Sequence, residues 1–359
     1  MKKIFAIAVL LFVCCGITYP QGCIPVRTIN AFGQYNFSNN AYTDLPWQLN
    51  ITNRYFKSSR DFREKTDQKT PEQNKNLNET YTLDVSINKI LKRGWSLNIG
   101  IPVNANARTT SFEHGGMNTL RRSTRSFGAG DLRFTVYKWV LQPAKKQKWN
   151  MQAGLGIKFA TGDYKYQDNF YRDDTTKILS AVNPGIQLGD GGTGIITEMN
   201  TFYILNKTFS FYGNFYYLIT PREQNGTGYS FGRTPTALQI RTGASVNSVP
   251  DVFSIRAGVF INAGNFSFSA GIRDEGTPVH DLVGGSEGLR RAGYNFSVEP
   301  GILYNTKTVT LFAYAPVVIG RRIKQNIPDK KTSDITGVKT VGPGASPDYI
   351  LIAGVSCRF

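Results

Sequence analysis

Charged side chains recur at every second position of otherwise apolar segments in this 359-residue chain. Residues that share one phase of a two-residue period lie on one face of a strand. Six basic and five acidic residues share the phase opposite to the apolar residues: Arg54, Asp84, Asp131, Arg133, Lys158, Glu198, Arg256, Arg273, Glu275, Glu299 and Arg358. Interleaved charges of both signs can pair with one another or line a watery passage. Their near balance favours ion pairs over a strongly anion-selective pore, which would use one sign of charge.

The segments that carry these charges alternate apolar and polar residues, as strands with one apolar face do. We expect twelve such strands, near 47–55, 81–87, 95–103, 132–136, 149–159, 195–203, 209–219, 253–262, 266–276, 294–304, 309–319 and 349–359. Long and short connections alternate between them, which is typical of an all-β, antiparallel, up-and-down transmembrane barrel with long external loops and short periplasmic turns. This parity places 238–246, which alternates weakly, in a loop hairpin or extension above the wall.

The chain ends on a strand that keeps its alternation through Phe359. A transmembrane barrel must pair its last strand with its first, because lipid tolerates no unpaired edge. A terminal Phe resembles the assembly signal of bacterial outer-membrane barrels, so we expect the barrel-assembly machinery to be a partner. The alternative is an edge strand of a soluble sandwich. Trp47, Trp95 and Trp149 open or adjoin strands at the periplasmic end, where outer-membrane barrels carry an aromatic girdle.

The first residues have the pattern of a secretory signal peptide: Lys2 and Lys3 precede an uncharged run over 4–15. The run is too short to span a bilayer, so a helical membrane protein is excluded. We expect a signal peptide over 1–22, a periplasmic lead-in over 23–46 and the barrel over 47–359. Cys23 and Cys357 would lie at the same rim, where they can form a disulfide, but Cys357 also falls on the apolar face as a small lipid-facing residue.

Basic residues outnumber acidic ones, with a formal net charge of +17 for the whole chain. The excess lies in expected loops and turns, for example at Arg121, Arg122, Arg125, Arg290, Arg291, Arg321, Arg322, Lys330 and Lys331. In an exported protein, such charges meet anionic lipopolysaccharide or anionic solutes. We expect no nucleic-acid partner, because no recognition helix, zinc knuckle or RNP-like strand accompanies the charge.

The residue types needed for catalysis are sparse. The two histidines, His114 and His280, fall in expected external loops, where we expect solvated side chains. His280, Asp281 and Ser286 have no nucleophile-elbow spacing, so the sequence does not predict a hydrolase. Paired Cys or His ligands are missing, and the glycine-rich 189–194 lacks the strand and helix of a phosphate loop. We therefore expect neither enzymatic activity nor a metal or cofactor.

Four stretches resemble the outer-membrane transporter-like family named after the meta-cleavage pathway of phenol degradation. They are Gly128-Ala-Gly-Asp-Leu-Arg-Phe134, Gly154-Leu-Gly-Ile-Lys-Phe-Ala-Thr-Gly-Asp163, Gly271-Ile-Arg-Asp-Glu-Gly-Thr-Pro278 and the run from Asp281 to Gly293. The resemblance implies a channel-like barrel that passes hydrophobic or aromatic small molecules, without catalytic residues. The chain departs from fatty-acid transporters in lacking a long apolar N-terminal plug.

These features predict a monomeric outer-membrane barrel that admits small, hydrophobic or aromatic solutes passively. The alternative is a non-conducting surface barrel whose external loops bind ligands or neighbouring molecules. It is favoured by the lengths of the loops over 221–250 and 321–346, which exceed what a simple connection needs.

Overall fold

The computed structural model describes residues 35–36, 41–42, 44–116, 119–143 and 147–359. The expected signal peptide and most of the expected lead-in lie outside these residues. Within the lead-in, β1 (Tyr35–Asn36) pairs with β2 (Ala41–Tyr42).

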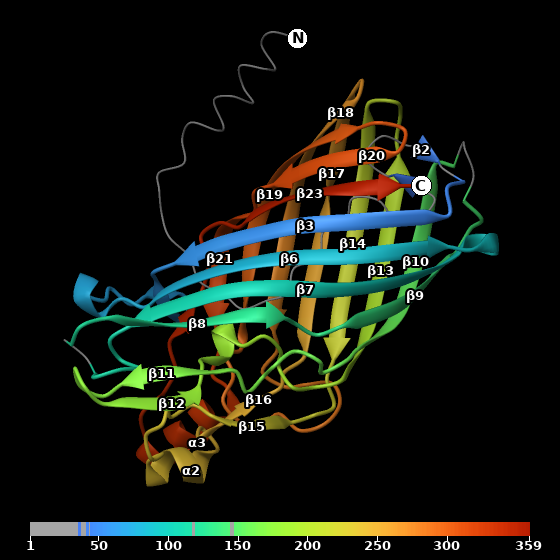
Figure 1. Ribbon diagram of the computed structural model, residues 1–359. Coiled ribbons are helices and arrows are strands. Elements are labelled where there is room, and N and C mark those ends of the chain that lie inside the picture. The colour runs from blue at the N-terminus through green and yellow to red at the C-terminus, as the bar shows by residue number, and fades with distance from the viewer. Residues whose placement is uncertain (1–34, 37–40, 43, 117–118, 144–146) are drawn as a thin grey trace.

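Antiparallel strands form a closed barrel of twelve wall positions (Figure 1). The wall consists of β3 (Trp47–Ser58), β6 (Leu77–Ile90), β7 (Trp95–Thr110), β9 (Arg133–Trp139), β10 (Trp149–Lys158), β13 (Gly194–Ile204), β14 (Phe209–Ile219), β17 (Val252–Ala263), β18 (Phe266–Thr277), β19 (Gly293–Asn305), β20 (Val309–Tyr314) and β23 (Leu351–Arg358). Each strand pairs with its neighbours along the chain, and β23 pairs with β3 to close the ring. The predicted strand number, order and closure are confirmed.

Two wall positions are interrupted. Position four consists of β8 (Arg122–Ala129) and β9, which both pair with β7, but only β9 pairs with β10. Position eleven consists of β20 and β21 (Val317–Ile323), which both pair with β19, but only β20 pairs with β23. In the outer half of the wall, β8 therefore has no strand partner on the side of β10, and β21 has none on the side of β23.

The outer face of the wall is apolar around the whole ring. Large side chains that are at least 40 % exposed occur on strand after strand, including Ile99, Leu155, Met199, Phe211, Ile255, Ile272, Ile302, Leu311 and Leu351. Such a continuous apolar surface would aggregate in water, whereas it matches the lipid-facing band of an outer-membrane barrel. Among the described residues, no helix is both long and apolar enough to cross a bilayer.

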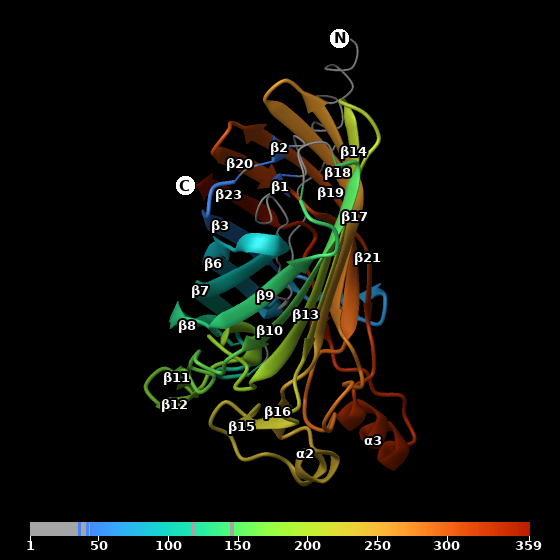
Figure 2. The same cartoon turned by 90° about the vertical axis from the view of Figure 1, so that its right-hand side faces the viewer.

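The long connections form a structured cap at the end of the barrel opposite the C-terminus (Figures 1 and 2). The cap contains β4 (Asp61–Arg63), β5 (Thr66–Asp67), η1 (Glu72–Asn74), β11 (Gln167–Tyr171), β12 (Lys177–Ala181), η3 (Pro184–Ile186), β15 (Gln224–Gly228), α2 (Ala237–Thr242), β16 (Val246–Ser248), α3 (Ile327–Thr336) and β22 (Gly344–Ala345). At the opposite end the connections are short, such as η2 (Lys92–Gly94) between β6 and β7.

The structure changes two expectations about the loops. Residues 238–246 do lie outside the wall, but helix α2 occupies 238–242, a turn follows over 243–245, and only Val246 belongs to a strand of the β15–β16 hairpin. The arginine-rich segment after Gly116, expected to be a loop, contains strand β8. The exposed side of β8 includes the polar side chains of Ser123 and Arg125, so it lacks the apolar alternation of a lipid-facing strand.

Candidate functional site

The inward-facing charges lie largely buried within the barrel. Ten of the eleven candidates are at most 9 % exposed: Arg54, Asp131, Arg133, Lys158, Glu198, Arg256, Arg273, Glu275, Glu299 and Arg358. Asp84 is partly exposed, and Asp131 lies in the break between β8 and β9. The structure brings most of these charges into separate small groups and does not arrange them as a continuous charged lining.

The largest group joins two arginines through one carboxylate. Glu299 on β19 accepts hydrogen bonds from Arg256 Nε at 3.0 Å and from Arg273 Nε at 2.6 Å. Glu275 adds a second carboxylate, 3.4 Å from Arg273 Nη1. We call Arg256, Arg273, Glu275 and Glu299 the charge cluster. Because its two positive and two negative charges are fully buried against one another, the cluster presents no free charge to a passing ion.

A second group lies where β8 gives way to β9. Lys158 Nζ lies 3.1 Å from Asp131 and also contacts Asp190, a residue that the sequence analysis did not select. Arg133 pairs with Asp84. The Lys158 pairs tie the end of β10 and the following loop to the interrupted wall position, and the Arg133–Asp84 pair ties β9 to β6.

The remaining candidates have different surroundings. Glu198 accepts a hydrogen bond of 2.8 Å from the Tyr137 hydroxyl. The Arg54 guanidinium lies 4.9 Å from the centroid of the Phe56 ring. Arg358 is opposite Gln48 in the β23–β3 register, and its Nε and Nη2 atoms are buried without a hydrogen-bond partner among the described residues.

Neutral amides continue the polar lining beside these charges. Asn214 donates to Asn200 at 2.7 Å, and Asn200 donates to Gln152 at 3.4 Å, which links three adjacent strands. Across the closing seam, Gln48 donates to Ser356 at 3.0 Å. This part of the interior is polar without carrying net charge.

Aromatic side chains occupy the same inward phase toward the periplasmic end. Even numbers of positions separate Trp139 from Arg133, Phe202 from Glu198 and Phe260 from Arg256, so each aromatic residue is on the inward face of its strand. Each of the three aromatic side chains is 2 % exposed. Trp139 packs edge-on against Phe202 with ring centroids 6.1 Å apart, and Phe260 lies 4.8 Å from Tyr212. We call Trp139, Phe202, Tyr212, Phe260 and Phe312 the aromatic layer, because they belong to one buried apolar cluster.

The sequence analysis did not select the aromatic layer, although a signal for it was present. Phe202 shares its parity with Glu198, and Phe260 shares its parity with Arg256. An aromatic residue in the polar phase of a barrel strand faces the interior, so parity alone identifies both residues.

An apolar groove lies on the outside of the wall near the β8 break. Tyr55, Tyr81, Ala105 and Phe127 are register partners across β3, β6, β7 and β8. Ala105 and Ala107 contribute small side chains between larger aromatic ones, and Tyr166 joins the lining from the following loop. The groove has a volume of about 320 Å³. This volume is at the lower end of the range for small-molecule sites, roughly 300–1,000 Å³.

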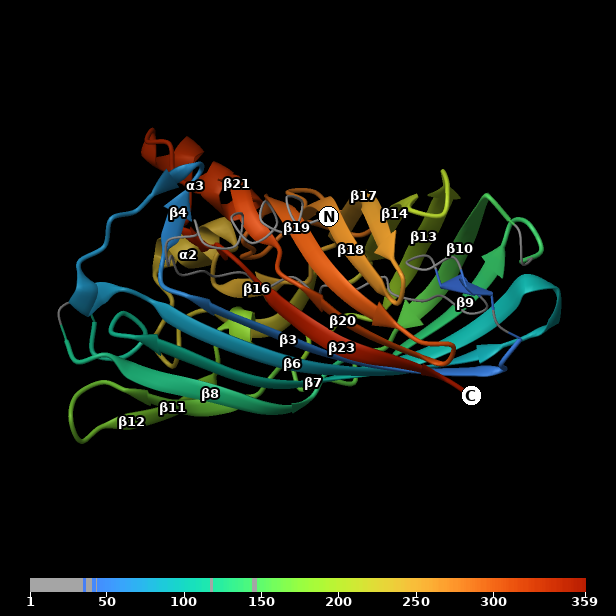
Figure 3. The ribbon, with the colours of Figure 1, turned by 90° about the horizontal axis from the view of Figure 1, so that it is seen from above.

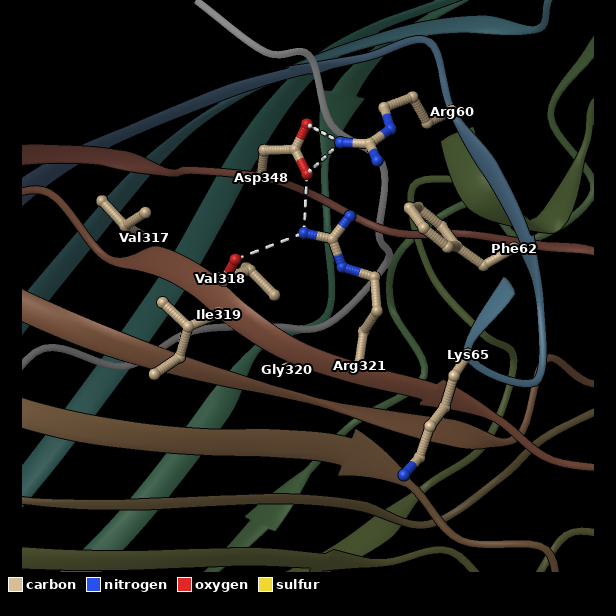
Figure 4. A pocket seen from close by; sticks show the side chains of 9 residues that line it. All are labelled: Arg60, Phe62, Lys65, Val317, Val318, Ile319, Gly320, Arg321 and Asp348. Atoms are coloured by element: carbon tan, nitrogen blue, oxygen red, sulfur yellow. Dashed lines mark hydrogen bonds and ion pairs between the residues drawn. The ribbon is translucent and has the colours of Figure 1, made fainter. Parts of the chain in front are cut away.

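A second hollow opens where β21 lacks a wall neighbour (Figure 4). Its volume is about 450 Å³. It is lined by Arg60, Phe62, Lys65, Val317, Val318, Ile319, Gly320, Arg321 and Asp348. We call this hollow the β21 notch. Of its charged residues, the sequence analysis named only Arg321, and as a loop charge; the structure places it at the end of a strand.

His114 differs from the solvated loop residue that was expected. Its ring is buried, stacks on Phe170 at 5.5 Å, and accepts a 3.0 Å hydrogen bond at Nδ1 from the Tyr171 amide. Burial lowers the pKa of His114 to about 4, and the nearby charges of Arg122 and Arg172 act in the same direction. His114 is therefore a neutral packing residue of the cap at pH 7.

The hydrolase constellation is not assembled. Ser286 Oγ accepts the backbone N–H of Asp281, and His280 Nε2 lies 3.4 Å from Lys330 Nζ. Within the described ranges, no group of three or more His, Cys, Asp or Glu side chains has the geometry of a metal site. Cys357 is half-buried on β23, and its suggested partner Cys23 falls outside those ranges.

Comparison with known proteins gives a structural likeness without a sequence match. No protein-family model and no curated protein matches the chain. The crystal structure of an outer membrane channel from Pseudomonas putida F1 superposes with a TM-score of 0.58 at 10 % identity, over 88 % of this chain and 97 % of that one.

Two other solved structures are similar at a lower level. They are a FadL homologue from Pseudomonas aeruginosa (TM-score 0.42, 9 % identity, 92 % and 95 % covered) and the P. putida toluene transporter TodX (TM-score 0.43, 9 % identity, 92 % and 99 % covered). The closed ring, the apolar outer face and the similarity to the P. putida F1 channel together show that the chain has the fold of an outer-membrane β-barrel.

Proposed function

We propose that this barrel passes small, uncharged, predominantly apolar molecules across the outer membrane and conducts ions poorly. The aromatic layer is the observation that carries the proposal. It lines the interior toward the periplasmic end with apolar surface, whereas a general porin keeps a polar, water-filled lumen.

The charge cluster supports the same solute class. An ion that enters a low-dielectric interior needs compensating charges, but Arg256, Arg273, Glu275 and Glu299 already compensate one another. A small uncharged molecule has no such requirement. It needs only the displacement of side chains that are held by apolar packing, as in the aromatic layer.

The family resemblance of the stretches from Gly128 to Gly293 points in the same direction. We propose that the chain belongs to the outer-membrane transporter-like family named after the meta-cleavage pathway of phenol degradation, with hydrophobic or aromatic molecules as solutes. The proposal also retains a signal peptide over 1–22, a lead-in over 23–46, recognition of Phe359 by the barrel-assembly machinery and contact with lipopolysaccharide.

The test is uptake of phenol into vesicles with lipopolysaccharide in the outer leaflet, because plain phospholipid is itself permeable to small aromatics. Vesicles that contain the native barrel should take up phenol faster than empty vesicles. Phe202→Asn, which places a polar group in the aromatic layer, should slow phenol uptake. Its control is Tyr203→Asn, the adjacent residue, which is 47 % exposed on the outer face. The proposal is wrong if the native barrel gives no uptake above that of empty vesicles.

The surface-binding alternative has one specific observation in its favour. The long loops form their own hairpins and helices, and helix α3 has a complete capping box between Asn326 and Asp329. A structured cap can serve as a ligand-binding surface. Deletion of residues 224–248 separates the two functions, because a binding protein would lose its ligand while a channel keeps or gains phenol uptake.

A further inference from the structure

The β21 notch forms because β21 has a strand partner on only one of its two sides. On one side, β21 pairs with β19 from Val317 to Ile323. On the other side, β23 begins only at Leu351 and follows β20, so the contacts there reduce to an isolated bridge between Val317 and Tyr349. Farther out, the β4–β5 hairpin borders the gap (Figure 3). There the backbone carbonyl oxygen of Glu64 accepts a 2.9 Å hydrogen bond from the Ile323 amide.

The charges that line the notch are predominantly positive. Asp348 forms one ion pair with Arg60, at 3.0 Å, and another with Arg321, at 2.6 Å (Figure 4). Lys65 is exposed, and its ammonium points away from Asp348. Arg60 also pairs with Asp67, at 2.8 Å from its Nε atom, so two carboxylates balance the two arginines. Lys65 is the cation that has no acidic partner among the residues that line the notch.

Two apolar residues of the notch, Val317 and Ile319, lie on the outer face of the wall, whereas Phe62 and Val318 are buried. Ile319 is 62 % exposed and lies beside Val317 on the strand that continues the lipid-facing row of β20. The notch therefore places Arg60 and Lys65, beside the β4–β5 hairpin, opposite β21, which contributes Arg321 and the branched aliphatic side chains.

The height of the notch corresponds to the outer lipid headgroups. Ile319 is ten residues beyond Val309, where β20 leaves its periplasmic turn. At about 3.3 Å per residue and a tilt of about 40°, this separation corresponds to roughly 25 Å along the membrane normal. The apolar band of such barrels is also about 25 Å tall, so Arg60, Lys65 and Arg321 lie near its outer boundary.

We propose that the β21 notch binds the phosphorylated headgroup of an outer-leaflet lipid. The Lys65 ammonium and the Arg321 and Arg60 guanidinium groups supply the charge and donors that a phosphate requires. Val317 and Ile319 pack against the first segment of an acyl chain. The bound lipid fills the interruption in the wall, which explains how a barrel with an unpaired strand edge remains sealed in a bilayer.

The test measures binding of three probes to the detergent-solubilised, full-length barrel by native mass spectrometry. The probes are diphosphorylated lipid A, the same glycolipid without phosphates, and inorganic phosphate. The native barrel should retain lipid A, and Lys65→Gln should weaken its binding about fivefold, because a basic residue near an anionic lipid surface contributes about 1 kcal/mol. Lys65→Arg should bind as the native chain does.

The matched control is Lys69→Gln, an exposed lysine in the same connection that does not line the notch. Mobility on gels before and after heating verifies that each variant is folded. Equal weakening by Lys65→Gln and Lys69→Gln would overturn the proposal, since it would show only general charge attraction. Equal retention of the glycolipid without phosphates would overturn it as well. Inorganic phosphate that displaces lipid A at equal concentration would show a site for soluble anions instead.

Discussion

Trp47 and Phe359 exchange two backbone hydrogen bonds, from Trp47 N to Phe359 O at 3.0 Å and from Phe359 N to Trp47 O at 3.1 Å. The final residue of the chain therefore pairs with the first residue of the first wall strand. The closing seam extends from this pair along β23 and β3 as far as Leu351 and Tyr55. Closure of the ring thus depends on the last residue as part of the wall, in addition to any role as an assembly signal.

This pair allows the two roles of Phe359 to be separated. Phe359→Ala keeps the backbone pairing and removes the ring, so we expect slower assembly in cells with little change in the stability of the folded barrel. Deletion of Phe359 also removes the two hydrogen bonds, which should lower the free energy of unfolding by about 1–3 kcal/mol. Pulse-chase assembly and urea unfolding measure the two effects. Native assembly kinetics for Phe359→Ala would contradict the assembly role.

Glu299 holds the charge cluster together. Glu299→Gln leaves Arg256 and Arg273 buried without their shared carboxylate, so we expect a loss of about 3–5 kcal/mol in the free energy of unfolding. Urea unfolding in phospholipid vesicles measures the loss. The control is Glu79→Gln, which removes a partly exposed ion pair with Lys57 and should cost less than about 1 kcal/mol. Similar costs for both variants would show that the cluster has no special importance.

Gly354 permits close approach of strands at the seam. A Cβ atom at this position would overlap the Ile51 carbonyl oxygen and the Phe312 ring. Gly354→Ala should therefore destabilise the barrel by about 1–3 kcal/mol, as overpacking does. The control is Gly264→Asn. Gly264 is a turn residue with φ +63° and open space around its Cα atom, and Asn tolerates this backbone conformation, so the free energy of unfolding should change little. Unfolding midpoints in urea compare the two variants.

The cap should loosen on acidification. His114 has a pKa of about 4 in the folded chain, below its ordinary value near 6.5, so the unfolded cap binds more protons between these values. Cap stability is thus fully present above about pH 6.5 and is lost as the pH falls toward 4. Protonation of Nδ1 also removes the acceptor for the Tyr171 amide.

Hydrogen exchange at Tyr171 measures this effect. After correction for intrinsic rates, protection of its amide should fall between pH 7 and pH 4.5 in the native chain. A His114→Asn chain has no titrating ring, so its Tyr171 protection should not change over the same range. Equal pH dependence in both chains would contradict the role of His114.

The sequence predicted the wall well, because lipid outside and polar groups inside impose a strict two-residue period on each membrane-crossing strand. This period located twelve strands and predicted an inward phase for Glu299. It could not locate β8, since the exposed face of this strand includes Ser123 and Arg125 and so lacks the apolar alternation of a lipid-facing strand. Helix α2 did have a local signal that was not used, the capping box formed by Thr236 and Gln239.

The pairing of inward charges was favoured from their near balance, but the particular partners depend on register. Arg256 is opposite Arg273, and Glu299 reaches both only because β19 is aligned so that Glu299 is opposite Gly271. The β21 notch was beyond sequence analysis. Arg60 and Asp348 are 288 positions apart and meet through closure of the ring.

Single-channel conductance in planar bilayers tests most directly whether paired charges keep ions out of this barrel. The native chain should conduct almost no ions. Arg273→Ala frees negative charge at Glu275 and Glu299 and should give a cation-preferring current, whereas Glu275→Ala should shift the preference toward anions. A native barrel that conducts at the level of a general porin, with an ion preference that neither substitution changes, would contradict the account.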